Sequence, residues 1–414
     1  MIITMKQTIR KSFKFRLNTT SEQSQKMIEF AGMNRFVWNK ALAMNLFRLE
    51  NKQSMLWYNE LAFWLKLWKS SEEYGFLKQC HSQPLQQTLK NLEKAFKDGF
   101  DKKQPLRRIP KFKRKGTFDS FRYPQGVKVD QACNKVFLPK IGWVKYRNSR
   151  QVIGDIKNMT ISRKGNHWYC SIQTEYEAEL KRHESTSMVG IDMGITRFVT
   201  LSDGSYVEPL NSFRKLSKKL AFEQRKLSKK VRFSANWKKQ KQRISKIHET
   251  VAYARHDFLH KTSSDISKNH AMIVVENLKV RNMSKSAKGN AEKPGKNVKA
   301  KSGLNKSILD QGWGMFVSFL EYKQAWSGGD VLKVNPQYTS QTCLSCSHVS
   351  KNNRKTQSKF ECEECGFKAN ADLVGALNVL ERGHRLLACG VETLVSSKKQ
   401  EPVGSSNTNL LLTA

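Results

Sequence analysis

Acidic residues are scarce in this 414-residue chain. It has 35 aspartates and glutamates against 74 lysines and arginines, which gives a formal net charge of +39 at neutral pH. A surface with such an imbalance repels itself, and a polyanion relieves the repulsion. The shortage of acid therefore favours nucleic acid as the partner, with an anionic membrane surface as the alternative.

Long apolar runs are also missing. No segment approaches the roughly 18 apolar residues that span a bilayer, and the N-terminal sequence MIITMKQTIRKSFKF becomes charged too early for a secretory signal. We therefore expect a cytoplasmic protein with no membrane partner. The 38% hydrophobic content still suffices for folded cores, and the length predicts two to four domains.

A disulfide framework is absent as well. Four of the eight cysteines are scattered singly, as is typical of a reducing compartment: Cys80, Cys133, Cys170 and Cys389. The other four form two C-x-x-C pairs with fifteen residues between them. Thiolates at this spacing suit a tetrahedral zinc ion. We predict one structural Zn²⁺ bound by Cys343, Cys346, Cys362 and Cys365. An iron–sulfur cluster or a metal-free redox pair is the alternative, which the polar, basic residues between the pairs disfavour.

The N-terminal half predicts strands interrupted by helices. Residues 12–17 alternate like a strand, and Thr20 with Gln23 (or Thr19 with Glu22) fits the capping box of a following helix. Helical periodicity continues to about residue 103, and strand patterns occupy residues 120–180. We expect a small β-barrel with a helical insertion. The linking sequence PLRRIPKFKRKGTF supplies three candidate nucleic-acid contacts: Lys113, Arg114 and Lys115.

A second unit begins near residue 188. MVGIDMGI and AMIVVENL are short buried-strand patterns, which lead to Asp192 and Glu276. RFVTLSDGSYV predicts a hairpin that turns at Asp203-Gly204. The sequence ADLVGALNVLERG predicts an amphipathic helix that begins near Asp372 and ends at Gly383. Six residues separate Cys365 from Asp372, so an acid closely follows the cysteine motif.

Positive charge concentrates in two stretches of this unit. Residues 211–246 hold fourteen lysines and arginines and one acid, Glu223, while Leu216, Leu220, Leu227 and Val231 fall on one helical face. We interpret this segment as a contact for backbone phosphates, with a merely solvated helix face as the alternative. The candidate contacts are Lys218, Lys219, Arg225, Lys226, Lys229, Lys230 and Arg232. Residues 281–306 hold eight cations and three glycines and predict a mobile basic loop.

Three acids suggest a catalytic centre. Each alone has an ordinary explanation, because an acid at a strand end often marks the return to solvent and Asp372 could complement a helix dipole. If the two strands are neighbours, however, Asp192, Glu276 and Asp372 converge. Clustered carboxylates repel each other without a cation. Two Mg²⁺ ions are the usual compensation in phosphodiester chemistry, so this pattern indicates a nuclease or transferase.

The motifs occur in a recognisable order. KFRLNTTSEQ, RFVWNKAL, GIDMGI, VVENL, the doubled C-x-x-C and NAD before an apolar helix resemble the TnpB (OrfB) family encoded by bacterial insertion sequences, over residues 8 to about 390. The resemblance implies an RNA-guided DNA nuclease related to type V CRISPR effectors. It places Asp192, Glu276 and Asp372 on the catalytic acids and the four paired cysteines on the zinc ligands. Val374 stands where many members have asparagine.

The resemblance also implies a multidomain α/β architecture. A wedge β-barrel would comprise residues 1–20 and 116–182, with a helical recognition insert, helix-turn-helix-like at its start, at 21–115. A RuvC-like nuclease domain of the RNase H fold would comprise 186–340 and 369–390, with a zinc ribbon at 341–368 and a loose tail at 391–414.

The function expected from these features is an Mg²⁺-dependent, RNA-guided DNA endonuclease of a bacterial transposable element, acting in the cytoplasm at the nucleoid. Its partners would be a guide RNA from the element and double-stranded target DNA cut beside a short flanking motif. A transposase that catalyses strand transfer is one alternative, although such enzymes usually order their acids D, D, E rather than D, E, D. A non-catalytic zinc-containing regulator is the other.

Overall fold

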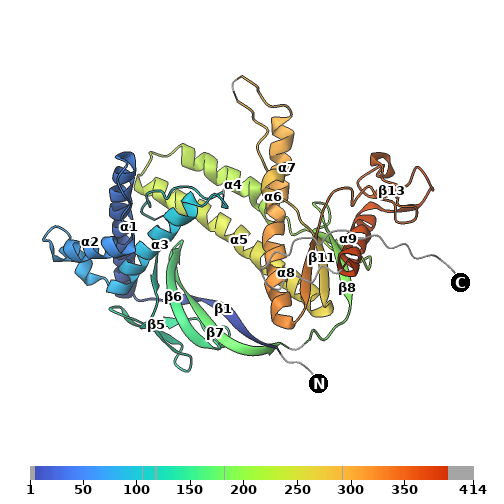
Figure 1. Ribbon diagram of the computed structural model, residues 1–414. Coiled ribbons are helices and arrows are strands. Elements are labelled where there is room, and N and C mark those ends of the chain that lie inside the picture. The colour runs from blue at the N-terminus through green and yellow to red at the C-terminus, as the bar shows by residue number, and fades with distance from the viewer. Residues whose placement is uncertain (1–4, 105, 117–118, 181, 291, 390–414) are drawn as a thin grey trace. The chain divides into compact units, whose positions relative to one another are not determined.

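The computed structural model describes residues 5–104, 106–116, 119–180, 182–290 and 292–389 (Figure 1). The chain divides into two compact units, one ending at Glu179 and the other beginning at Leu180. This division lies close to the predicted boundary between residues 182 and 186. The predicted tail at 391–414 lies outside the described residues. No helix in the described part of the chain is long and apolar enough to cross a membrane.

The first unit combines a seven-stranded sheet with a helical insertion. The strands run in the order β2-β6-β7-β1-β5-β4-β3. Their bounds are β1 Met5–Asn18, β2 Ser120–Tyr123, β3 Lys128–Asp130, β4 Lys135–Leu138, β5 Gly142–Tyr146, β6 Asp155–Lys164 and β7 His167–Leu180. The predicted first strand is therefore longer than residues 12–17. Trp168, Cys170 and Ile172 alternate into the core as expected. Closure of the sheet into a barrel stays a prediction.

The insertion follows β1 directly. Its helices are α1 Ser21–Glu50, α2 Tyr58–Ser70, the 3₁₀ helix η1 Gly75–Gln79 and α3 Ser82–Phe100. The Thr20–Gln23 capping box is present: each side chain accepts a hydrogen bond from the other residue's backbone N–H. Phe30 of α1 packs edge-on against Phe121 of β2, with ring centroids 5.8 Å apart. Helices and sheet thus share one apolar core.

The second unit is built on a five-stranded sheet with the order β10-β9-β8-β11-β12. The strands are β8 Met188–Met193, β9 Val199–Leu201, β10 Tyr206–Val207, β11 Met272–Glu276 and β12 Asp330–Val334. β8, β11 and β12 are parallel, whereas β9 is antiparallel to β8. The apolar runs MVGIDM and MIVVE form the centre of the sheet because both of its faces are covered.

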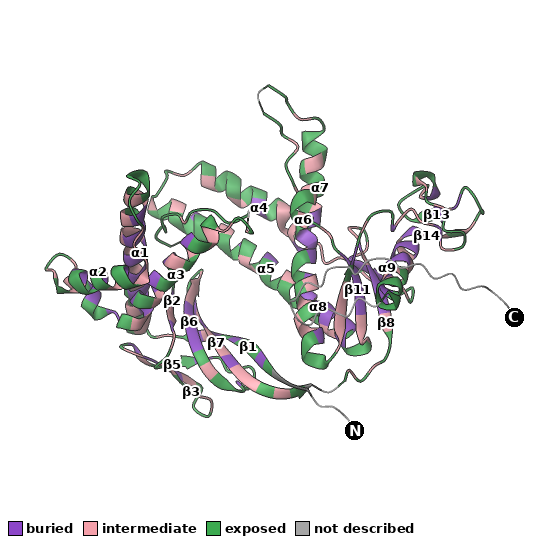
Figure 2. Cartoon of the chain, viewed as in Figure 1, coloured by how far each residue is buried: buried purple, intermediate pink, exposed green. Residues whose placement is uncertain are grey.

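Helices cover both faces of this sheet. The helices of this unit are α4 Ser212–Ser228, α5 Ala235–Asn269, α6 Val280–Met283, α7 Val298–Gln311, α8 Trp313–Ser327 and α9 Ala371–Ala388, of which α5 and α8 cover one face and α9 covers the other. Ile191 and Val275 pack in one cluster with Leu259 of α5 and Phe316 of α8. Val274 packs with Val379 of α9 on the opposite face. Buried residues accordingly concentrate on β8, β11 and α9 (Figure 2).

Three predictions about this unit need correction. In the basic segment 211–246, Val231 does not share a helical face with Leu216, Leu220 and Leu227, because it lies in the exposed link between α4 and α5. Residues 298–306 of the predicted mobile loop belong to α7. Gly383 does not end its helix, which continues to Ala388. A Cβ at Gly383 would lie 2.5 Å from Val274 Cγ2, so this glycine permits close packing of α9 on β11.

Candidate active site and zinc site

Asp192 and Glu276 lie on the same edge and the same face of the five-stranded sheet. β8 and β11 are parallel neighbours paired up to Ile191 and Val275, so the next residue of each strand is an acid. Successive side chains point to opposite faces of a strand. Ile191 and Val275 face α5 and α8, and the two acids therefore point toward α9. This register places the two acids next to each other, and their catalytic role stays a prediction.

Asp372, in the first turn of α9, lies near the same strand ends. Asn370 caps the helix, because its Oδ1 accepts hydrogen bonds from the N–H groups of Asp372 and Leu373 at 3.0 and 3.3 Å. α9 lies very close to β8: a Cβ at Gly190 would be 2.3 Å from the Ala376 carbonyl oxygen. A Cβ at Gly375 would be 3.0 Å from Asp192 Oδ2. The helix thus brings its acid to the strand ends.

The three carboxylates interact electrostatically. Burial, followed by the charges of Glu276 and Asp372, raises the pKa of Asp192 to about 7, while Arg354 opposes the shift. Burial also raises the pKa of Glu276, against a hydrogen bond that Thr339 Oγ1 donates to Glu276 Oε1 at 2.5 Å. The acids are less tightly gathered than a preformed ligand set, since within the described ranges only the paired cysteines bring three or more ligand atoms within 4.8 Å of one another.

Arg354 and Thr339 are site residues that the sequence did not reveal. Arg354 lies between the two cysteine pairs, and its Nη2 donates to Asp372 Oδ1 at 3.1 Å and to the Gln357 carbonyl oxygen at 2.8 Å. Thr339 bonds Glu276, and its carbonyl oxygen accepts from Asn378 Nδ2 of α9 at 2.9 Å. Neither residue belongs to a periodic pattern, so the only available signal was closeness to the cysteine motif.

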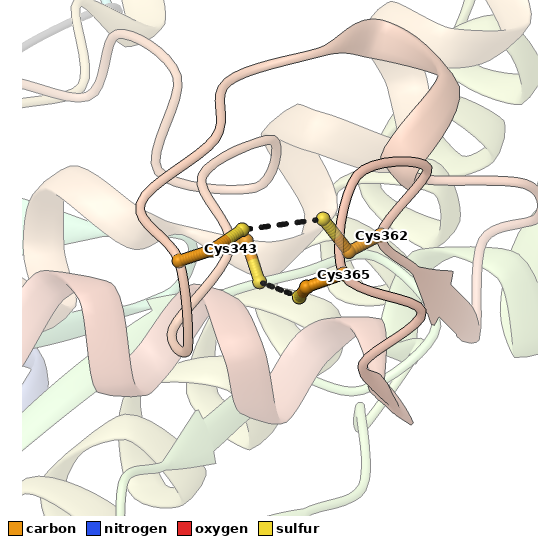
Figure 3. A group of neighbouring side chains, drawn as sticks. Cys343, Cys362 and Cys365 are labelled. Atoms are coloured by element: carbon orange, nitrogen blue, oxygen red, sulfur yellow. Dashed lines mark hydrogen bonds between the residues drawn. The ribbon is translucent and has the colours of Figure 1, made fainter.

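The four paired cysteines form a second centre. Their Sγ atoms lie within 4.8 Å of one another, and the Cys343–Cys365 and Cys346–Cys362 sulfur pairs are each 3.6 Å apart (Figure 3). Four thiolates about 2.3 Å from a tetrahedral zinc ion would be about 3.8 Å apart. The cysteines therefore fit a zinc ion.

This cysteine knuckle is built directly onto α9. It contains the 3₁₀ helix η2 Lys351–Asn353 and the antiparallel strands β13 Lys359–Glu361 and β14 Lys368–Asn370, and β14 runs straight into the helix. Phe360 packs in one cluster with Cys343, Cys362 and Val374. Val374 is fully buried there, which gives a packing reason for an apolar residue at this position. The knuckle therefore fixes the start of α9, where Asp372 lies.

The basic segment forms an antiparallel helix pair, α4 and α5. Its single acid, Glu223, is not paired with a cation: Gln240 Nε2 donates to the Glu223 carbonyl oxygen at 2.9 Å and to its Oε2 at 2.5 Å. Six predicted contacts are exposed, namely Lys218, Lys219, Arg225, Lys226, Lys229 and Arg232, and Lys230 is half-buried. The structure thus leaves these cations at the surface without neutralising them.

Of the three basic residues of the first unit, Lys113 is held against α1. Asn39 exchanges two hydrogen bonds with the backbone of Lys113, at 2.8 and 3.0 Å, and Trp38 Nε1 donates to the Lys111 carbonyl oxygen. The Lys113 side chain is exposed as a whole, but its ammonium lies 3.8 Å from the centre of the Trp38 ring, and burial there lowers its pKa to about 8. Arg114 and Lys115 are exposed.

Known proteins resemble this chain over nearly its whole length. It is 53% identical to the Escherichia coli (strain K12) protein described as "Putative RNA-guided DNA endonuclease InsQ", over 94% of this chain and 97% of that one. A Streptomyces pristinaespiralis protein described as "Putative RNA-guided DNA endonuclease" is 30% identical, over 96% and 98% of the two chains.

Family models and a solved structure agree with these relatives. Residues 171–287 match a family described as a probable transposase, residues 313–379 a Cas12f1-like TNB domain and residues 5–53 a helix-turn-helix domain. The fold is similar to that of a chain in the cryo-EM structure of a Cas12f1–sgRNA–target DNA complex, with a TM-score of 0.50, 13% identity and coverage of 90% and 98%. The chain belongs to the TnpB (OrfB) family, which is related to the type V CRISPR effectors.

Proposed function

We propose that this protein is an RNA-guided DNA endonuclease of a bacterial insertion sequence, which acts in the cytoplasm at the nucleoid. The observation that carries the proposal is the convergence of Asp192, Glu276 and Asp372 at one end of the central sheet. Two close relatives described as RNA-guided DNA endonucleases support it. The guide RNA would come from the element, and the target would be duplex DNA beside a short flanking motif.

The site residues fit divalent metal ions. Carboxylate oxygens are the ligands that Mg²⁺ prefers. Burial and the neighbouring charges of Glu276 and Asp372 raise the pKa of Asp192, and a bound cation would offset both effects. Asp192, Glu276 and Asp372 would hold two Mg²⁺ ions. Such ions supply activation of the attacking water and stabilisation of the leaving oxygen. Thr339 would keep Glu276 oriented, and Arg354 would hold Asp372 in place.

The topology of the second unit supports a RuvC-like assignment. Numbered within the sheet, its strands run 3-2-1-4-5 with the second strand antiparallel, which is the arrangement of the RNase H fold. The zinc ribbon at 341–368 would be an insertion in this domain. The first unit would act as the wedge domain with its recognition insert. The exposed cations of α4 and α5, with Arg114 and Lys115, would contact phosphates of guide and target.

One assay distinguishes the proposed function from its two alternatives, a transposase and a non-catalytic regulator. Wild-type protein and Asp192→Ala are incubated with target plasmid and Mg²⁺, with and without guide RNA. We expect the wild type to cut only with guide RNA, and the variant to bind guide and target without cutting. Asp257→Ala, which alters an exposed aspartate of α5, is the matched control and should cut normally.

Each alternative predicts a different result in this assay. Strand-transfer products without guide RNA would indicate a transposase. Undiminished cutting by Asp192→Ala would contradict the proposed catalytic role of that acid. Specific binding by the wild type without any cleavage would favour a regulator.

A further inference from the structure

The link between α4 and α5 presents two bulky apolar side chains to solvent. We call residues 229–234 the hairpin tip. Val231 is 79% exposed and Phe233 63% exposed. A single exposed apolar residue needs no explanation, but two at the end of a helical hairpin form a small apolar surface where a polar turn would be expected. The exposure of these side chains therefore indicates a binding role for the hairpin tip.

The backbone holds Phe233 in this position at an energetic cost. Its φ is +68°, in the left-handed region that glycine and asparagine favour and aromatic residues avoid. Trp237 lies against the Phe233 ring with centroids 5.4 Å apart, and Ser234 caps α5 by accepting a hydrogen bond from the Trp237 N–H at 3.1 Å. The Phe233 ring is thus fixed in an outward direction. Strain of this kind is commonly retained at binding sites.

The surroundings of the tip carry charge of one sign. Lys229, Lys230 and Arg232 alternate with the apolar residues, and the Arg232 guanidinium carbon lies 5.0 Å from the centre of the Phe233 ring. No acid occurs between residues 224 and 248, and Glu223 is bonded to Gln240 inside the hairpin. Exposed apolar side chains whose charged neighbours along the chain are all cations complement a ligand with an apolar face and negative charge around it. An unpaired nucleotide has both features.

We propose that Phe233 stacks on an unpaired base of the guide RNA while Lys229, Lys230 and Arg232 bind the adjoining phosphates. This inference rests on the proposed RNA-guided function. A folded guide RNA offers unpaired loop bases before any target is bound, whereas the target duplex exposes unpaired bases only after it has been opened. A second copy of this chain is disfavoured as the occupant because it would bring a tip of the same charge.

The substitution Phe233→Gly tests the proposal sharply. Glycine removes the ring and also relieves the left-handed strain, so the thermal stability of the variant should be unchanged or higher. Guide affinity at fixed salt should nevertheless fall about 5- to 150-fold, which corresponds to 1–3 kcal/mol for one stacked base. Phe233→Tyr keeps a stacking ring and should retain affinity within about twofold. Tyr206→Ala, at a residue of β10 that is 49% exposed, is the matched control and should bind normally.

A photo-crosslinking amino acid in place of Phe233 identifies the bound base. We expect crosslinks to one unpaired position of the guide RNA in the full complex. Crosslinks to target DNA or to another protein chain, or unchanged guide affinity in Phe233→Gly, would overturn the proposal. If the wild-type protein failed to bind guide RNA at all, the proposed function itself would fail. Normal wild-type binding with an unaffected Phe233→Gly variant would contradict only the stacking inference.

Discussion

The carboxyl group of Asp192 is held protonated up to about pH 7, because burial and the neighbouring Glu276 and Asp372 disfavour its charge. In the unfolded chain the same group ionises near pH 4. Between these values the folded protein binds a proton that the unfolded chain has released, so stability decreases as the pH rises through this window. Above pH 7 the folded protein carries the full free-energy cost of an ionised Asp192, unless a bound cation offsets it.

Asp192→Asn should remove this penalty. In metal-free protein the variant should equal the wild type near pH 4 and become progressively more stable up to pH 7, by on the order of 2–4 kcal/mol, since one pKa unit corresponds to 1.36 kcal/mol. Thermal unfolding in chelator between pH 4 and 8 measures the difference. The exposed substitution Asp257→Asn should leave the wild-type curve unchanged. Parallel curves for wild type and Asp192→Asn would show that Asp192 does not carry the shift.

Arg354 gives a second prediction at the scale of a single residue. Its guanidinium holds Asp372 at 3.1 Å and would compete with the proposed metal ion for that carboxylate. Arg354→Ala should therefore lower the Mg²⁺ concentration needed for half-maximal cleavage, yet decrease the saturated rate about tenfold or more because Asp372 loses its orientation. Guide affinity should not change. The neighbouring cation Lys355, which pairs with Glu361 at 3.8 Å, provides the control variant Lys355→Ala. A higher Mg²⁺ requirement in Arg354→Ala would exclude competition.

At the scale of elements, the cysteine knuckle and α9 act as one piece, because Phe360 and Val374 share a core with the cysteines. Cys362→Ser should abolish zinc binding and unfold the knuckle locally, since zinc binding contributes about 10–16 kcal/mol in small finger peptides. Asp372 would lose its anchor, and a displacement near 1 Å can cost on the order of a hundredfold in rate. Cleavage should fall at least that far, with guide binding nearly retained.

The control for this prediction is Cys133→Ser, which alters an exposed cysteine of the first unit. Zinc content, guide affinity and cleavage are measured on the same preparation of each variant. The substitution Cys133→Ser should leave all three unchanged. Full cleavage by zinc-free Cys362→Ser would mean that Asp372 is positioned by the packing of α9 on β8 alone.

Local patterns predicted those elements whose causes are local. Asp192 and Glu276 were predicted because each lies at the end of a short apolar run that favours a buried strand, and Thr20 was predicted because a capping box needs only four residues. The prediction that the helix ends at Gly383 was wrong. A glycine after an amphipathic run usually ends a helix, whereas here the close contact with Val274 requires a residue without a Cβ. The break between α4 and α5 was missed because the Ser234 cap is hidden among lysines and arginines.

For the whole molecule, the sequence and the family resemblance predicted an α/β chain of more than one unit, but they did not predict the contacts of Arg354 and Thr339. Such contacts join residues far apart in the chain, as with Thr339 and Glu276. Only the folded sheet places them together, so no spacing rule could reveal them. The sign and size of the net charge follow from the composition alone. They determine how strongly binding to a nucleic acid depends on salt.

A net charge of +39 predicts guide binding that weakens steeply with salt. The logarithm of affinity falls with the logarithm of salt concentration by about 0.7 per phosphate neutralised on a single strand. Neutralising Lys229, Lys230 and Arg232 together with glutamine should therefore flatten this slope by about 2. Lys26, Lys94 and Lys97 already pair with acids one helical turn away, so the matching triple substitution to glutamine should change the slope far less. Equal slopes for the wild type and both triple variants would assign the charge of the hairpin tip to solvation alone.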